Sequence, residues 1–155
     1  MQVKNVKSFV GREGYGFNAN LYLSGKKLAF AIDDASGGGV NYQWEGSTTE
    51  EKLANQKLAK DFVDAHPPEL MDPNAEAWVK TLYTDGKRKL DLDELVTRLV
   101  DQFENDKNLN RKKKTSVPFT TPACASGNYF VMKHNGDIEG TKAFILKKHP
   151  DATFL

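Results

Sequence analysis

Residues 17–32 read FNANLYLSGKKLAFAI, and this stretch decides the expected fold class. Its first half alternates apolar and other side chains with period two, as a half-buried strand requires. The apolar members of that alternation are Phe17, Ala19, Leu21 and Leu23. Ser24-Gly25 then provides a tight turn, because glycine tolerates a positive φ. A second alternation follows in Leu28, Phe30 and Ile32, so the stretch predicts a β-hairpin.

Strand patterns also flank this hairpin on both sides. Residues 3–10 form an apolar-rich segment before it, and Val40, Tyr42 and Trp44 alternate after the glycine-rich loop of residues 33–39. We therefore expect an antiparallel meander of three or four strands over residues 1–45.

The glycines of GREGYG, residues 11–16, raise the question of a phosphate-binding loop. Such loops work because a strand leads through glycines into a helix whose first amides face the anion. Here the glycine spacing is G-x-x-G-x-G, and the strand pattern of residues 17–23 follows it. The stretch therefore predicts a hairpin loop without a nucleotide. The glycines at 37–39 also precede a strand, so they too predict a loop without a nucleotide, and a loop that closes on a partner is the alternative.

Helical patterns replace the strand patterns after residue 46. Ser47 and Glu50 have capping-box spacing, and the helix they begin is expected to end at His66-Pro67, since a residue before proline avoids the α region. A second helix is expected from Asp72-Pro73, because proline is tolerated in a first helical turn, to the TDG turn at 84–86.

The clearest amphipathic helix follows Asp91, which forms a second candidate cap pair with Glu94. Its apolar face consists of Leu92, Leu95, Val96, Leu99, Val100 and Phe103. The next residues, NDKNLNRKKKT at 105–115, are polar and have no periodicity. They predict a long exposed loop.

The C-terminal part predicts a short strand–helix unit. Strands are expected at 117–121 and 129–133, a turn at Asn135-Gly136, a helix over 140–149, and a short pairing strand in the final DATFL. The whole chain is thus expected to be α+β, with an N-terminal antiparallel β-meander packed with three to four helices. We expect one domain over residues 1–155, with the exposed basic loop at 105–115.

Composition excludes several classes of protein. The 155 residues contain 22 basic and 21 acidic side chains, a net charge of +1, which argues against a surface devoted as a whole to nucleic acid. The single cysteine excludes an intramolecular disulfide. The N-terminus lacks the apolar core of a signal peptide, and no apolar run has the length of a membrane span. These features predict a cytoplasmic protein.

No catalytic or metal-binding constellation is evident. His66, His134 and His149 lack the spacing of a zinc motif, and His66 and His149 each precede proline at a helix end, where an imidazolium would favour the helix dipole. Cys124 has no catalytic signature around it, although His134 would approach it if the flanking strands paired suitably. We expect no catalytic residue, no metal and no cofactor.

The N-terminal sheet offers the best candidate surface for a partner. Exposed aromatic side chains beside asparagine and a flexible acidic loop are typical of contacts with another protein. The candidate residues are Tyr15, Asn18, Asn20, Tyr22, Asp33, Asp34, Tyr42 and Trp44. The structural alternative is that these aromatic residues form cross-strand pairs that stabilise the sheet.

A basic run supplies the alternative function. Five cations fall within eight residues: Lys107, Arg111, Lys112, Lys113 and Lys114. Such a cluster neutralises phosphates and releases counterions on binding nucleic acid. Solvation, or pairing with the acidic residues just before the run, is the structural alternative.

The chain resembles a family at both ends. EGYGFNANLYLSGKKLAFAIDDASGGG, followed by Tyr42 and Trp44, is similar to the start of small uncharacterised accessory proteins of tailed bacteriophages and prophages, and KAFILKKHPDATFL is similar to their endings. The resemblance implies a protein that acts in the host cytoplasm by binding and blocking a host protein, such as a defence component. It implies no particular site residue.

Three functions follow as hypotheses. The first is a non-enzymatic accessory protein that binds and modulates a host protein. The second is a nucleic-acid-associated protein that uses the basic run at 107–114. The third is an enzyme whose site is assembled from residues scattered along the sequence.

Overall fold

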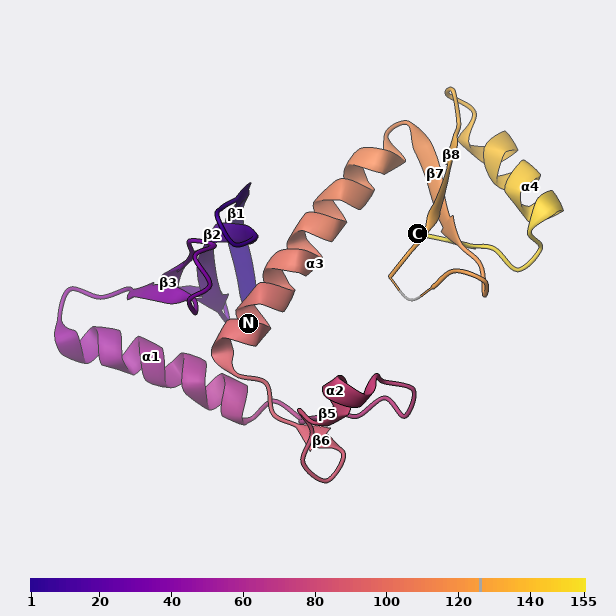
Figure 1. Cartoon of the computed structure of the whole chain (residues 1–155). Helices are drawn as coiled ribbons and strands as arrows, with labels where there is room; N and C mark the ends of the chain where they lie inside the picture. Colours follow the sequence, from indigo (N-terminus) through magenta and orange to yellow (C-terminus); the bar gives the residue numbers. More distant parts are fainter. Residues whose placement is uncertain (126) are drawn as a thin grey trace. The chain divides into compact units, whose positions relative to one another are not determined.

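A computed structural model describes residues 1–125 and 127–155 and confirms the α+β class (Figure 1). Contacts divide the chain into two compact units, Met1–Phe103 and Glu104–Leu155, and helix α3 (Leu92–Lys113) contributes residues to both. The expectation of a single domain stays a prediction, and each unit is described by itself.

The first unit is built on the expected four-stranded antiparallel meander. Its strands β1 (Gln2–Val10), β2 (Tyr15–Leu23), β3 (Lys26–Asp33) and β4 (Asn41–Trp44) pair in sequence order. Ser24 and Gly25 both have positive φ, 49° and 85°, as the predicted tight turn requires. A register shift in β1 between Lys4 and Lys7 lets Val3 and Val6 both face the core.

The GREGYG stretch is a hairpin loop, as predicted. The Gly11 amide donates to the Gly14 carbonyl at 2.8 Å, and the Glu13 amide donates to the Ala35 carbonyl at 2.9 Å. A Cβ on Gly11 would lie 2.5 Å from the Ala35 Cβ. This glycine therefore permits close packing of two loops, the one at 11–14 and the one that follows β3.

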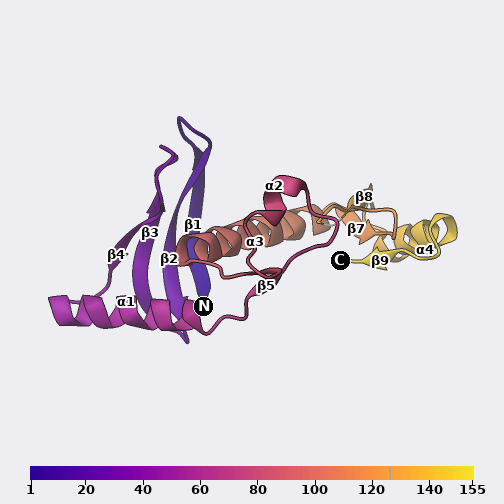
Figure 2. The same cartoon turned by 60° about the horizontal axis from the view of Figure 1, so that its bottom comes forward.

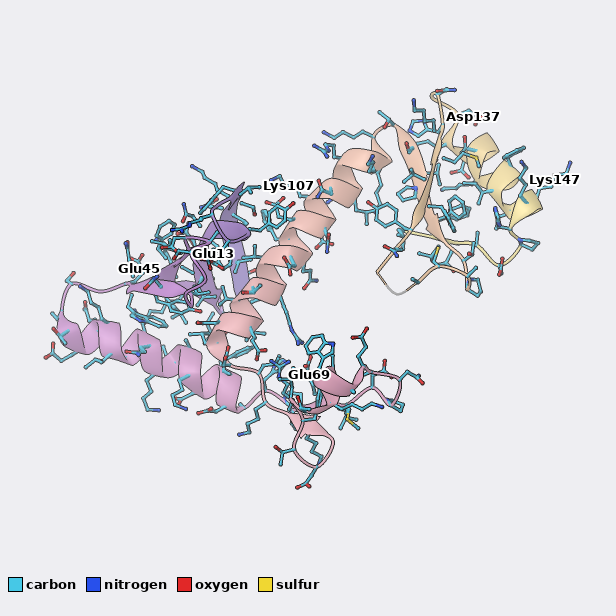
Figure 3. The ribbon with its side chains drawn as sticks, viewed as in Figure 1. Glu13, Glu45, Glu69, Lys107, Asp137 and Lys147 are labelled. Atoms are coloured by element: carbon cyan, nitrogen blue, oxygen red, sulfur yellow. The ribbon has the colours of Figure 1, made fainter. Side chains whose placement is uncertain are left out.

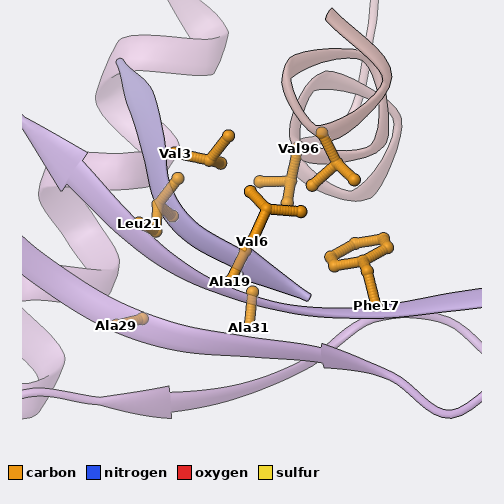
Figure 4. Close-up of a cluster of buried hydrophobic side chains, with 9 residues drawn as sticks. Val3, Val6, Phe17, Ala19, Leu21, Ala29, Ala31 and Val96 are labelled. Carbon is orange, nitrogen blue, oxygen red and sulfur yellow. The ribbon is translucent and has the colours of Figure 1, made fainter. Parts of the chain in front are cut away.

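The core of the first unit lies between one face of the sheet and α3 (Figure 4). Small residues on β2 and β3 leave room for Val96 and Val100 of the helix. The strand residues in this buried cluster are Val3, Val6, Phe17, Ala19, Leu21, Ala29 and Ala31. On β2 the apolar residues of the predicted alternation, Phe17, Ala19 and Leu21, face this core. On β3 the core residues are Ala29 and Ala31, so the predicted apolar set of Leu28, Phe30 and Ile32 lies on the other face of the sheet.

Helix α1 (Thr49–Asp64) contacts β3 and β4 near the end of the sheet (Figure 2). Its capping box differs from the predicted one: Thr48 and Glu51 form it, in place of Ser47 and Glu50. Both pairs have the required spacing, so only the backbone geometry distinguishes them. Asn55 attaches the helix to the sheet, since its amide donates to the Glu45 carbonyl at 2.7 Å.

The second expected helix is mostly absent, and this prediction is wrong. Only α2 (Ala77–Lys80) is helical between β5 (Glu69–Leu70) and β6 (Lys87–Arg88). Asp72 accepts a hydrogen bond from the Asn74 amide at 2.8 Å, which stabilises a turn where the helix was expected to begin. Trp78 is 64% exposed, so the segment lacks the buried apolar face that would stabilise a longer helix.

Helix α3 begins at the predicted cap pair. The Glu94 amide donates to the Asp91 carboxylate at 2.8 Å, and the Asp91 amide donates back to the Glu94 carboxylate at 3.3 Å. The prediction of a loop at 105–115 is wrong, because residues 105–113 continue this helix, whereas the predicted exposure of this segment is confirmed for all but Leu109. Extending an existing helix needs no further nucleation, and the cations of the last turn favour its carbonyl end.

The second unit contains the predicted strand–helix arrangement. Strands β8 (Phe130–Lys133), β7 (Ser116–Thr120) and β9 (Thr153–Phe154) form one sheet in that order, and helix α4 (Ile138–Lys148) packs against it. Val117, Phe119 and Ile145 form its buried core. The Asn135-Gly136 turn and the pairing of the final strand are confirmed.

Candidate protein-binding groove

The register of the sheet divides the predicted contact residues between two faces. Tyr42 and Trp44 lie opposite Ala31 and Ala29, so they share the core face with α3. The other predicted strand residues lie elsewhere: Asn18, Asn20 and Tyr22 pair with positions on the opposite face, and Tyr15 is 82% exposed at the hairpin end. The structure therefore does not bring the predicted residues together on one surface.

Tyr42 and Trp44 form one wall of an open groove. Their rings stack with centroids 5.3 Å apart and planes inclined by 23°. The groove has a volume of about 760 Å³, and the other walls come from α1 and from the residues before and at the start of α3. Its further lining residues are Leu53, Gln56, Lys57, Lys60, Val63, Asp64, Lys89, Leu90, Asp91 and Leu92.

The groove combines an apolar interior with a charged margin. Leu53 is 58% exposed on the α1 wall, so it adds to the exposed apolar surface of the groove. Lys57 pairs with Asp61 at 2.6 Å, and Lys60 pairs with Asp64 at 2.5 Å, along the same helix. With Lys89, these cations place three ammonium groups along an apolar channel.

Asp93 holds the aromatic wall in position. Its carboxylate accepts from the Tyr42 hydroxyl at 2.8 Å and from the Val40 amide at 3.1 Å. Burial, together with the hydrogen bond to Asp93, raises the pKa of Tyr42 far above its usual range. Tyr42 therefore stays neutral and fixed by its hydroxyl, and its ring supports Trp44 at the groove.

The acidic pair after β3 has a structural role. Asp33 accepts from the Ala35 amide at 2.9 Å, and Asp34 accepts from the Ser36 amide at 3.1 Å and from its hydroxyl at 2.5 Å. The hydrogen bonds from Ser36 lower the pKa of Asp34 below its usual value. Both predicted contact residues thus shape the loop, although Asp34 remains exposed.

The predicted basic run is displayed by a helix. Lys107, labelled in Figure 3, pairs with Glu104 at 3.2 Å, and Arg111 donates to the Asn108 side chain at 3.3 Å. Lys112 and Lys113 belong to the last turn, where cations complement the helix carbonyls, and Lys114 follows it. These interactions favour a structural role for the cations, in which they pair with nearby side chains and with the helix end. Nucleic-acid binding by the run stays a prediction.

Cys124 and His134 lie at opposite ends of their hairpin. The His134 amide donates to the Thr115 carbonyl at 3.2 Å, before β7 begins, whereas Cys124 follows the other end of β7. The pairing therefore separates the thiol from the imidazole that would have to activate it. Within residues 1–125 and 127–155, no three His, Cys, Asp or Glu side chains gather as metal ligands.

The other two histidines lie near helix ends, as the sequence predicted. His149 is the C-cap of α4, and its ring lies 5.7 Å from that of Phe119. His66 follows the C-cap of α1, and its amide donates to the Val63 carbonyl at 3.0 Å.

Sequence reasoning missed most of the groove. The α1 wall comes from residues at spacings of three and four, such as Leu53, Gln56 and Lys60, whose mixed polarity conceals a common face. The signal available was weak, because α1 carries a second exposed leucine, Leu58, that does not line the groove. The contribution of residues 89–92 depends on the tertiary fold.

Comparison of the chain with protein-family models, curated protein sequences and solved structures gives no significant match. Among the described residues, no helix is both long enough and apolar enough to cross a membrane. Function is therefore inferred from the chain's own residues.

Proposed function

We propose that this chain is a non-enzymatic accessory protein that binds a second protein through the groove between β4 and α1. The observation that carries the proposal is the open apolar channel beside the Tyr42–Trp44 stack, with Leu53 exposed on its opposite wall. Aromatic residues beside a concave apolar surface are the usual anchors of protein interfaces.

The groove chemistry indicates what the partner presents. A large apolar side chain fills the channel, and burying such a side chain contributes about 1.5–3 kcal/mol. An acidic residue beside that anchor complements Lys89 at the margin, since Lys57 and Lys60 already pair with Asp61 and Asp64 along α1. The partner segment is therefore apolar with a flanking carboxylate.

The resemblance to phage and prophage accessory proteins suggests where this partner is found. It favours a host protein in the cytoplasm, whose activity is modulated when the groove is filled. The fixed position of the Tyr42 ring also supports binding over catalysis, since the Tyr42 hydroxyl is committed to Asp93 and lacks a reacting partner.

The test compares two leucines of α1. Leu53 lines the groove, whereas Leu58 is 41% exposed on the same helix and does not line it. The tagged wild-type chain and the Leu53→Gln and Leu58→Gln variants are used to capture proteins from lysate of a candidate bacterial host, with and without nuclease treatment. The captured protein is then titrated against each variant.

Leu53→Gln should weaken the partner's affinity about tenfold or more, which corresponds to about 1.4 kcal/mol. Leu58→Gln should leave it nearly unchanged, and circular dichroism should show both variants folded. Equal affinities for the two variants would refute the groove as the binding site. Capture that disappears on nuclease treatment would refute a protein partner.

A further inference from the structure

The face of the sheet opposite α3 carries a repeated arrangement of side chains. One cross-strand row places Lys4 opposite Asn20, Asn20 opposite Phe30, and Phe30 opposite Gln43. The neighbouring row consists of Lys7, Asn18, Ile32 and Asn41. Both rows run over all four strands in the same order: a cation, an amide, an apolar side chain and a second amide.

This face is separate from the groove. Tyr42 and Trp44, which border both α1 and the start of α3, point to the other side of the sheet. Asn18, Asn20, Phe30 and Ile32 are half-buried by their strand neighbours. Within the described residues, none of the four amide side chains in the two rows has a hydrogen-bond partner. Their donors and acceptors are therefore available to a ligand.

The charge of this face favours an anion. None of the paired positions that face this side between Gln2 and Gln43 is a carboxylate. Glu45, beyond the end of β4, pairs with Lys27 at 2.6 Å. Residues 1–103 nevertheless contain thirteen basic and sixteen acidic side chains, so a face with lysines and no carboxylate contrasts with the rest of its unit.

Aromatic rings add a third feature. The ring of Phe9 covers Gly16, where a Cβ would lie 2.8 Å from the ring, and Phe9 remains 39% exposed. Lys4 lies 4.7 Å from the centroid of the Tyr22 ring, and Phe30 lies between the amides of its row. Tyr22 and Phe30 are half-buried, and partly open rings on a sheet are platforms on which unpaired bases stack.

We propose that this face binds single-stranded nucleic acid. Lys4 and Lys7 contact successive phosphates, the amides bond to base edges, and Phe9, Tyr22 and Phe30 stack with bases. Adjacent rows are about 7 Å apart along the strands, close to the length of one extended nucleotide. Duplex DNA fits less well, since four strands span about 14 Å and its major groove is about 12 Å wide.

Binding is measured with the whole chain by fluorescence anisotropy. The probes are labelled oligo-dT and oligo-U of about ten nucleotides, and a duplex of the same length. Both single strands should bind more tightly than the duplex. With two phosphate contacts, log affinity plotted against log salt concentration should have a slope of about −1.4. Oligo-dU of the same length is the third single strand, and a difference between oligo-dU and oligo-U would identify RNA or DNA as the ligand, because these two differ only in the 2′-hydroxyl.

Matched variants locate the site. Asn20→Asp is nearly isosteric and places a carboxylate beside Lys4, so it should weaken binding about tenfold, equivalent to about 1.4 kcal/mol. Gln102→Glu makes the same change of charge on the exposed side of α3 and should have little effect. Joint replacement of Lys112, Lys113 and Lys114 by serine should also leave the affinity unchanged. Thermal melts establish that each variant is folded.

Three results would overturn the proposal. The first is duplex binding as tight as single-strand binding. The second is a slope of log affinity against log salt concentration near −3.5, the value for five cations on a single strand. This result counts if the slope is lost when Lys112, Lys113 and Lys114 are replaced by serine. The third is an Asn20→Asp chain that binds the oligonucleotides normally but loses a protein partner, which would make this face a protein interface.

Discussion

Tyr42, which the sequence predicts as an exposed contact residue, has a structural role in the fold. The sequence placed it correctly on a strand beside Trp44, and the alternation at 40–44 predicted that both side chains share a face. No local pattern indicated Asp93, a residue far away along the chain whose carboxylate accepts from the Tyr42 hydroxyl. Pairing of this kind depends on tertiary contact, so local pattern does not contain it.

Raising the pH should destabilise the chain through Tyr42. Its pKa is raised in the folded protein, chiefly by burial and by the bond to Asp93, whereas the unfolded chain loses this proton near pH 10. Below about pH 10, Tyr42 therefore adds no pH dependence to the free energy of unfolding. Above about pH 10, the Tyr42 hydroxyl is deprotonated only in the unfolded state, and the free energy of unfolding should fall by about 1.4 kcal/mol per pH unit.

Denaturant unfolding of the wild-type chain and the Tyr42→Phe variant between pH 8 and about 11.5 measures this effect. Lysines and other tyrosines titrate in both chains, so the difference between their stabilities isolates Tyr42. That difference should shrink as the pH rises above 10. A difference that stays constant throughout would mean that the hydroxyl is not held by Asp93.

At the scale of elements, the strands were predicted better than the helices. All four strands of the meander were predicted, and on β2 the period-two alternation also identified the face that α3 buries. On β3 it did not, because the small residues Ala29 and Ala31 face the helix. Helix ends depended on weaker signals. The Asp72-Pro73 start was overridden by a local turn, and the polar residues after Phe103 remained helical without an apolar face. Both outcomes reflect the small free energies that decide whether a short polar segment is helical.

The helical state of residues 105–113 can be tested at Asn108. Proline in a helix interior removes a hydrogen bond and clashes with the preceding turn, at a cost of about 3 kcal/mol. Asn108→Pro should therefore reduce the helical circular dichroism signal and increase amide exchange in the flanking turns. Asn108→Ala should preserve or increase the signal, since alanine is the best helix former. Identical spectra for the two variants would instead support the exposed loop.

At the scale of the whole molecule, the nearly even composition conceals an uneven distribution of charge. The thirteen basic and sixteen acidic residues of 1–103 give a formal charge of −3, whereas the nine basic and five acidic residues of 104–155 give +4. A net charge of +1 is therefore a poor guide to either unit. The composition correctly excluded a uniformly charged surface, but only the fold reveals the carboxylate-free face of the sheet.

Filling of the groove is the central claim, and Trp44 can report it directly. The chain has two tryptophans, and Trp78 lies on α2 with 64% of its surface exposed. Trp78→Phe leaves Trp44 as the only indole, and Trp44→Phe leaves Trp78. Both single-tryptophan chains are titrated with the protein captured by the wild-type chain, after that partner's own emission is subtracted.

The emission of Trp44 should shift to shorter wavelength in the Trp78→Phe chain, because an apolar side chain of the partner displaces water from the stacked ring. The emission of Trp78 should stay unchanged in the Trp44→Phe chain at partner concentrations that saturate this variant. Binding of the partner without any change at Trp44 would contradict the groove as the site of recognition.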